Sequence, residues 1–258
     1  MSKKYLIGNW KMNLSFGEAS LFVHRLDKEM TNHKDVEVAI APTMLALATL
    51  HRDIDQKKIK LAAQNVHYAD HGTFTGEVSA AMVKDYVDYA IVGHSDRRQK
   101  FHESNDDIAR KMAACIRNGI TPVLCVGEDL LTRQSEQTDF VIHDQVVSAL
   151  AMLTDEDISK IIIAYEPIWA LSSGDGHGEW AKPDIVAKTA KHILKTVGQL
   201  YGKKAEGNLR ILYGGSSNPE NLGSYLNLKE IDGCLVGGAS MNYKSFAQMI
   251  EIAHKKSK

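Results

Sequence analysis

The sharpest chemical signal in the sequence is a glutamate that directly follows a short apolar run. Glu166 comes after Ile161–Tyr165 and precedes Pro167, which cannot continue a strand. A carboxylate partly withdrawn from water at a strand end can act as a general base, and a salt-bridged structural glutamate is the alternative. The next residues, up to Trp180, are rich in glycine and serine, a composition typical of loops that cover active sites.

A histidine stands at the end of another apolar run. His94 follows Tyr89–Val92, and Ser95 or Asp96 is expected to cap a short helix there. A helix N-terminus beside an imidazole lowers its pKa, and the neutral ring can donate a hydrogen bond to a carbonyl group. A purely structural histidine is the alternative, because the chain contains 11 histidines.

An amide and an ammonium group close the first apolar run. Asn9 and Lys11 are two residues apart, so we expect them to share one face of an extended chain. Together they suit an anionic or carbonyl substrate. A solvated strand end is the alternative, because lysines are mostly surface residues.

Paired glycines end the last two apolar runs, as Tyr213-Gly214-Gly215-Ser216 and Val236-Gly237-Gly238. Glycines let backbone N–H groups approach a phosphate closely, and tight turns are the alternative interpretation. A base, a neutral hydrogen-bond donor and a cation around a phosphate-anchored carbonyl compound describe an aldose–ketose isomerisation. This chemistry predicts neither a metal ion nor any other cofactor.

Eight short apolar runs alternate with longer amphipathic segments, and they must position these groups. The predicted strands are Tyr5–Trp10, Val36–Ala41, Ile59–Ala63, Tyr89–Val92, Thr121–Val126, Ile161–Tyr165, Arg210–Tyr213 and Gly233–Val236. Helices are predicted at Phe16–Met30, Asn105–Asn118 with Gly119 as a stop signal, Asp184–Leu200 and Tyr243–Lys255.

This alternation predicts an α/β fold, a single-domain (β/α)8 barrel over residues 1–258. A doubly wound open sheet is the alternative, but the first strand end, Gly8–Lys11, does not fit the glycine-rich fingerprint of that fold. In a barrel the carboxyl ends of all strands meet at one face. The polar groups described above are therefore expected to lie together.

The composition excludes several other classes of protein. The formal net charge is −1, with 31 basic and 32 acidic residues, which argues against binding to nucleic acid or to a membrane surface. Three cysteines without zinc-like spacing favour reduced thiols. The apolar stretch near Met1 is too short for a signal peptide, so a cytoplasmic protein is expected. His67 and His71 lack a third ligand at a recognisable spacing, so no metal site is predicted.

Seven motifs in a fixed order resemble those of one known family. They are Gly8–Asn13, Ala63–Asn65 with Gly72–Ser79, Val92–Ser95 with Arg97-Arg98, Pro122–Glu128, Ala164–Ala170, Tyr213–Ser216 and Leu235–Ser240. Together they make the chain similar to triosephosphate isomerases along nearly its whole length. The resemblance implies a TIM barrel that interconverts D-glyceraldehyde 3-phosphate and dihydroxyacetone phosphate through an enediolate, in glycolysis and gluconeogenesis.

The resemblance also implies roles for single residues. Glu166 would be the catalytic base, His94 the electrophile and Lys11 a catalytic and substrate-binding cation beside Asn9. The phosphate would be held by the backbone of the lid residues Ser172, Ser173 and Gly174 and of Ser216, Gly237 and Gly238. The family forms homodimers through the loop Gly72–Ser79, in which Thr75 would support Asn9 and Lys11 of the other subunit.

The sequence departs from the family pattern at two places. Asp96 stands where the family has a glutamate near the lysine, so its side chain is one methylene shorter. Eight residues separate Gly174 from Pro183, where the family has about four, and Ser172 replaces a glycine. Because of the lengthened lid, a catalytically impaired homologue that binds a phosphometabolite or acts as a regulator is the alternative function. An aldolase is disfavoured, because no lysine stands at the end of strands five to eight.

Overall fold

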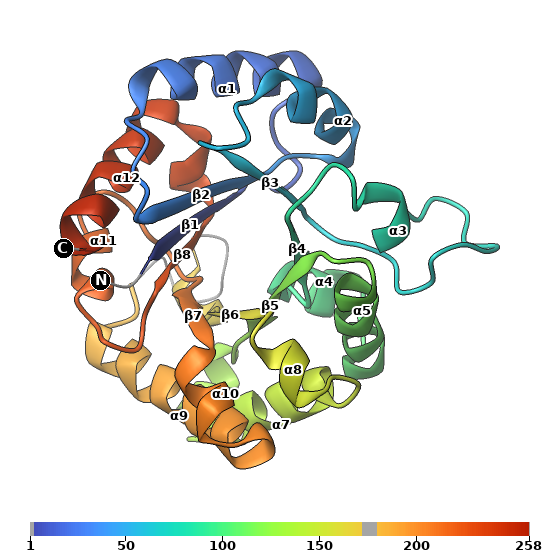
Figure 1. Cartoon of the computed structure of the whole chain (residues 1–258). Helices are drawn as coiled ribbons and strands as arrows, with labels where there is room; N and C mark the ends of the chain where they lie inside the picture. Colours follow the sequence, from blue (N-terminus) through green and yellow to red (C-terminus); the bar gives the residue numbers. More distant parts are fainter. Residues whose placement is uncertain (1–2, 172–179, 258) are drawn as a thin grey trace.

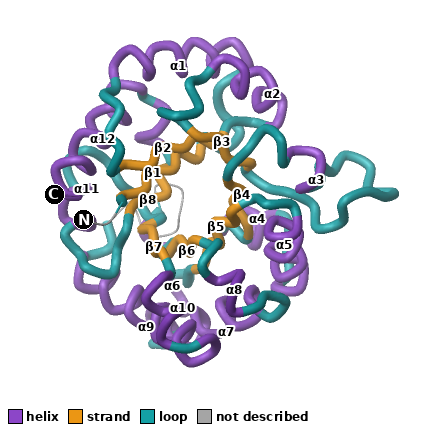
Figure 2. The backbone as a smooth tube through the Cα atoms, in the orientation of Figure 1, coloured by secondary structure: helices purple, strands orange, loops and turns teal. Residues whose placement is uncertain are grey.

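Eight parallel strands close into a barrel in the computed structural model, which describes residues 3–171 and 180–257. Each strand pairs with its sequence neighbours, and β1 also pairs with β8 to close the ring. Figures 1 and 2 show this ring of strands with the helices outside it. The strands are β1 Lys4–Asn9, β2 Val36–Ala41, β3 Lys60–Ala63, β4 Tyr89–Val92, β5 Thr121–Val126, β6 Ile162–Tyr165, β7 Arg210–Tyr213 and β8 Gly233–Val236.

The predicted fold class is therefore confirmed, and each predicted strand coincides with an observed strand to within one residue at either end. The local cause is the apolar composition of these short runs. Strands that are buried on both faces need apolar side chains at consecutive positions, not only at alternate ones.

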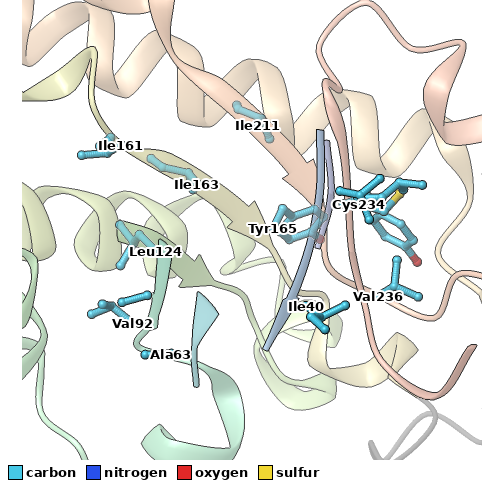
Figure 3. Packing of buried hydrophobic residues seen from close by; sticks show 14 of the residues in the cluster. Ile40, Ala63, Val92, Leu124, Ile161, Ile163, Tyr165, Ile211, Cys234 and Val236 are labelled. Carbon is cyan, nitrogen blue, oxygen red and sulfur yellow. The ribbon is translucent and has the colours of Figure 1, made fainter. Parts of the chain in front are cut away.

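Alternate residues along the strands enter two separate cores. Ile7, Ile91 and Leu212 belong to the cluster inside the barrel, together with residues such as Ala39 and Val123. Their neighbours point outward into the larger cluster between barrel and helices. Figure 3 shows part of that outer layer, with Ile40, Val92, Leu124, Ile163, Tyr165 and Ile211.

Helices cover the outer face of the barrel. The longer ones are α1 Phe16–Glu29, α2 Met44–Asp53, α5 Asn105–Arg117, α7 Thr138–Leu150, α9 Pro183–Tyr201 and α12 Tyr243–Ser257. The shorter ones are α3 Ala80–Val83, α4 Ser95–Lys100, α6 Leu130–Gln134, α8 Asp155–Ile158, α10 Lys203–Asn208 and α11 Leu222–Leu226, with 3-10 helices η1 Ile168–Ala170 and η2 Gly238–Met241.

Local sequence signals explain where the predicted helices begin and end. Capping boxes start α1 at Ser15 and α5 at Ser104, and Pro183 occupies the first turn of α9. Gly119 follows α5 with a φ of +73°, as its role as a stop signal requires. No helix in the described part of the chain is long and apolar enough to span a bilayer.

One segment stands away from the barrel. The chain between β3 and α3 extends outward, and an isolated parallel bridge joins His67 to Ser79 at its base (Figure 1). Residues 71–77 are exposed and contain most of the predicted dimer loop Gly72–Ser79, whose last residue, Ser79, is buried.

Candidate active site

A pocket of about 480 Å³ opens at the carboxyl ends of the strands. Its walls contain most of the side chains that the sequence singled out, although they come from strands far apart in the chain. The predicted site residues among its lining are Asn9, Lys11, His94, Glu166, Ser216, Gly237 and Gly238. The barrel topology alone brings them together, because every strand ends at this face.

The carboxylate of Glu166 lies at the bottom of the pocket and is 2% exposed. Its Oε1 is 3.0 Å from His94 Nε2, and its Oε2 accepts a hydrogen bond of 3.1 Å from the backbone N–H of Ser95. Both oxygens are therefore held by donors from the segment that follows β4. The residues predicted as base and electrophile are in direct contact.

The hydrogen bonds around His94 define its neutral tautomer. Its Nδ1 accepts a 3.0 Å hydrogen bond from the backbone N–H of Asp96, so the proton of the neutral ring lies on Nε2. This also corrects the sequence analysis, because neither Ser95 nor Asp96 caps the short helix α4. His94 is itself the N-cap, and its ring replaces the usual serine or aspartate oxygen as the acceptor.

Two glycines make room for the base. A Cβ on Gly214 would lie 2.6 Å from Glu166 Cγ, and one on Gly127 would lie 1.7 Å from the carbonyl oxygen of Glu166. Real Cβ atoms do not come this close to other atoms. The position of the Glu166 carboxylate therefore depends on one glycine directly after β5 and another directly after β7. The Gly-Gly pair predicted as a phosphate feature therefore has a second use at Gly214.

Two opposing effects act on the pKa of Glu166. Burial by itself raises the pKa of its carboxyl, but the contact with His94 and the hydrogen bond from Ser95 lower it, and Lys11 adds to this effect. The net result is a pKa below the ordinary value, so the group is ionised and can accept a proton.

Lys11 has a strained backbone that neighbouring side chains hold in place. Its φ is +53°, so the expectation that Asn9 and Lys11 lie on one extended strand was wrong. Instead, β1 ends at Asn9, whose Oδ1 accepts a 3.1 Å hydrogen bond from the Lys11 N–H. Gln64 Nε2 donates to the Lys11 carbonyl at 2.7 Å and ties this turn to β3. The ammonium nevertheless reaches the pocket.

Asp96 does reach the lysine despite its short side chain. Its Oδ2 is 3.0 Å from Lys11 Nζ, and its Oδ1 is 2.8 Å from Lys100 Nζ. Partial burial would raise the pKa of Asp96, but Lys100 and Lys11 outweigh it and lower the pKa to about 2. The carboxylate is therefore a permanent anion between two cations.

The predicted phosphate region lines the same pocket as Lys11. Gly237 and Gly238 leave open space where a Cβ would be, and the 3-10 helix η2 begins at Gly238. The backbone N–H of Ser216 donates to the carbonyl of Ala170 at 3.1 Å. A phosphate bound by this N–H would have to replace that bond.

Comparison with known proteins agrees with this geometry. A family model described as triosephosphate isomerase matches residues 4–253. The chain is also 41% identical over 252 residues to a triosephosphate isomerase of Endomicrobium trichonymphae, covering 97% of this chain and 99% of that protein. The chain belongs to the triosephosphate isomerase family. The resemblance noted in the sequence is thereby confirmed, and so is the prediction of an isomerase.

In this member of the triosephosphate isomerase family, the sequence analysis gave no role to one buried carboxylate that contacts residues on both sides of Glu166. Glu128, which is 1% exposed, accepts hydrogen bonds from Trp169 Nε1 at 2.9 Å and from the Tyr165 hydroxyl at 3.1 Å. Burial raises the pKa of Glu128. Its bonds fix residues on both sides of Glu166. Its place at the end of an apolar run, directly after Gly127, was the available signal.

Two remaining groups of predicted site residues are those of the lid and Thr75. Ser172, Ser173 and Gly174 fall outside the described residues. Leu171 and Trp180, which flank the undescribed stretch, both line the pocket. Thr75 is exposed on the segment that extends away from the barrel, and it is not part of the pocket lining.

Proposed function

We propose that the chain interconverts D-glyceraldehyde 3-phosphate and dihydroxyacetone phosphate by proton transfer through an enediolate. The observation that carries this proposal is the 3.0 Å contact between the buried carboxylate of Glu166 and Nε2 of His94, whose Nδ1 is occupied as an acceptor. A carboxylate and a neutral donor side by side can remove a proton from carbon and polarise the neighbouring carbonyl.

The base would take the proton from the carbon next to the carbonyl group and return it to the adjacent carbon, while the hydroxyl proton passes to the former carbonyl oxygen. His94 would donate from Nε2 to the substrate oxygen that becomes negative. The fixed acceptor bond at its Nδ1 supports this role, because it keeps the proton on the nitrogen that faces Glu166. No change of tautomer is needed before the reaction.

Lys11 would stabilise the same developing charge and attract the doubly charged phosphate ester. Asn9 would act beside it, both as a substrate contact and through the hydrogen bond that holds the Lys11 backbone. Asp96 would position the ammonium without contacting substrate. The 3.0 Å ion pair between Asp96 and Lys11 supports this positioning role.

The phosphate group would lie against the backbones of Ser216, Gly237 and Gly238, with Ser172, Ser173 and Gly174 covering it from the lid. The open space at the two glycines supports this placement, since it admits a tetrahedral anion close to the main chain. Isomerisation of these triose phosphates would serve glycolysis and gluconeogenesis in the cytoplasm.

We further propose a homodimer through the loop Gly72–Ser79, with Thr75 near Asn9 and Lys11 of the other subunit. Large apolar side chains elsewhere on the surface are also exposed, among them Met12 after β1 at 94% and Leu45 on α2 at 88%. Phe74 on the loop itself is 41% exposed. Such a surface favours burial against a second copy, and sedimentation of the purified chain tests it.

The experiment that tests the reaction is a coupled assay with glyceraldehyde 3-phosphate on the wild type and on Glu166→Gln. Loss of the base should lower kcat on the order of 10³-fold, within the usual range for general bases. Glu156→Gln, an exposed residue of α8, is the matched control and should keep full activity.

Calorimetry with dihydroxyacetone phosphate distinguishes the isomerase from the alternative, a homologue that binds a phosphometabolite without catalysis. If the wild type has no turnover but both proteins bind the phosphate ester, the chain is a phosphometabolite-binding homologue and the isomerase proposal fails. If Glu166→Gln keeps wild-type turnover, another group is the base.

A further inference from the structure

A cluster of histidines and carboxylates lies at the end of the barrel opposite the pocket. His33 and Asp35 immediately precede β2, and Glu251 and His254 lie on the last turns of α12. We propose that these four side chains bind a divalent transition-metal ion such as Zn²⁺. The sequence analysis considered only His67 and His71 for such a site, and tertiary folding is what unites these four.

The distances between the four groups support a shared ligand site. His33 Nε2 is 2.8 Å from Glu251 Oε1, and His254 Nδ1 is 2.9 Å from Asp35 Oδ1. Single ligand atoms of His33, Asp35 and His254 all lie within 4.8 Å of one another. A tetrahedral zinc ion with bonds of about 2.0 Å needs ligand atoms about 3.3 Å apart, so modest side-chain movement closes the site.

The two rings must turn to share one ion. They stack with centroids 3.7 Å apart and planes 4° from parallel, so their lone pairs lie in two nearly parallel planes. Rotation about the Cβ–Cγ bond of histidine has a broad, soft profile and lets both lone pairs converge. The side chains of His33 and His254 are 12% and 23% exposed, which leaves a path for an ion from solvent.

The donor set fits this class of metal. Two imidazoles with one or two carboxylates suit Zn²⁺, Ni²⁺ and Cu²⁺ better than Mg²⁺ or Ca²⁺, which prefer oxygen ligands alone. Ser257 donates a hydrogen bond to Asp35, and such outer contacts orient a ligating carboxylate.

Metal binding would fasten the end of α12 to the segment before β2. α12 packs against α1, β1 and β2, so this bond would stabilise one edge of the barrel far from the reaction. A ligand that binds only the folded chain raises the unfolding temperature in proportion to the logarithm of its concentration. Binding should also strengthen from pH 5 to pH 8, because a protonated histidine cannot coordinate.

The competing explanation is a pair of histidine–carboxylate contacts with no affinity for metal. It is tested by equilibrium dialysis of the untagged chain against Zn²⁺, and by the visible absorption of bound Co²⁺. We expect the wild type to bind one equivalent of metal, and we expect His33→Asn and His254→Gln each to lose this binding. Ser257→Ala should weaken binding about 10- to 100-fold.

His51→Ala is the matched control, because His51 is a histidine on α2 whose contacts are with Gln56 and the Tyr86 carbonyl. It should retain the full equivalent. No binding by the wild type, or an unchanged equivalent in both cluster variants, overturns the proposal. If the cluster variants unfold, NMR of the wild-type histidine rings decides, since Zn²⁺ must shift the His33 and His254 signals before those of His51.

Discussion

The two carboxylates around the pocket hold their charge through different partners. Asp96, on the side of β1 and α4, lies between the ammonium groups of Lys11 and Lys100, and its side chain is 26% exposed. Glu166, on the side of β6 and β7, is almost fully buried and is held by an imidazole and a backbone N–H. One anion has two ammonium groups as its partners, and the other has an imidazole and a backbone amide.

This difference separates a positioning group from a base. A carboxylate whose pKa is lowered to about 2 by two lysines is a poor proton acceptor, and its value lies in fixing Lys11. Glu166 is also ionised, but burial opposes its charge, so accepting a proton relieves the cost of desolvation. The same functional group therefore takes two roles because its surroundings differ.

The largest effect on the cationic side should come from Lys11→Met. Removal of a charge aimed at the reacting oxygen should lower kcat/KM on the order of 10²- to 10³-fold. Lys100→Met is the matched control, because Lys100 pairs with the same Asp96 but does not line the pocket. As an exposed ion pair it should change kcat/KM by about twofold. Equal losses in both variants would mean that Lys11 acts only through Asp96.

On the buried side, Gly214→Ala should displace the base without removing it. The added Cβ would lie 2.6 Å from Glu166 Cγ, and a misplacement of about 1 Å can cost on the order of 10²-fold in kcat. Gly207→Ala in α10 is the control, because no atom lies within 4 Å of its Cβ position. Thermal unfolding must accompany the assay, and normal kcat with a lower unfolding temperature would refute the positioning argument.

Asp96→Asn and Asp96→Glu sharpen the positioning role. The amide loses the charge that holds Lys11 and should lower kcat/KM about tenfold, as expected for a lost charge-assisted hydrogen bond. The glutamate keeps the charge and should remain within about threefold of the wild type, because only side-chain rotation is needed. Steady-state kinetics decide, and an inactive Asp96→Glu with an active Asp96→Asn would reverse the interpretation.

The smallest expected effect is a shift in the pKa of Glu166. NMR of carboxyl-labelled glutamates in the free protein should show Glu166 titrating below its ordinary pKa of about 4.3, with Glu166→Gln identifying the signal. Because the folded pKa is depressed, the stabilisation it reports is present above the unfolded pKa and is lost as pH falls through the folded pKa. In His94→Gln the imidazole is lost and burial remains, so the pKa of Glu166 should rise. An unchanged pKa would mean that the contact with His94 contributes little.

The sequence by itself determined the barrel and the membership of its site. Strands such as Val36–Ala41 and Thr121–Val126 are apolar at nearly every position, and that pattern requires burial on both faces. Once eight such strands are parallel and closed, the groups at their carboxyl ends must meet. Asn9, His94, Glu166 and the paired glycines were therefore found together, as their places in the sequence indicated.

Only the tertiary structure decided how those groups are held. Lys11 adopts a left-handed turn, the ring of His94 caps helix α4, and Asp96 lies between two lysines. These three features depend on atoms from several strands. The cluster of His33, Asp35, Glu251 and His254 likewise joins the two ends of the chain. Apolar periodicity reports which faces are buried. It carries no information on which polar atoms meet, because those contacts depend on distances between elements that local sequence does not set.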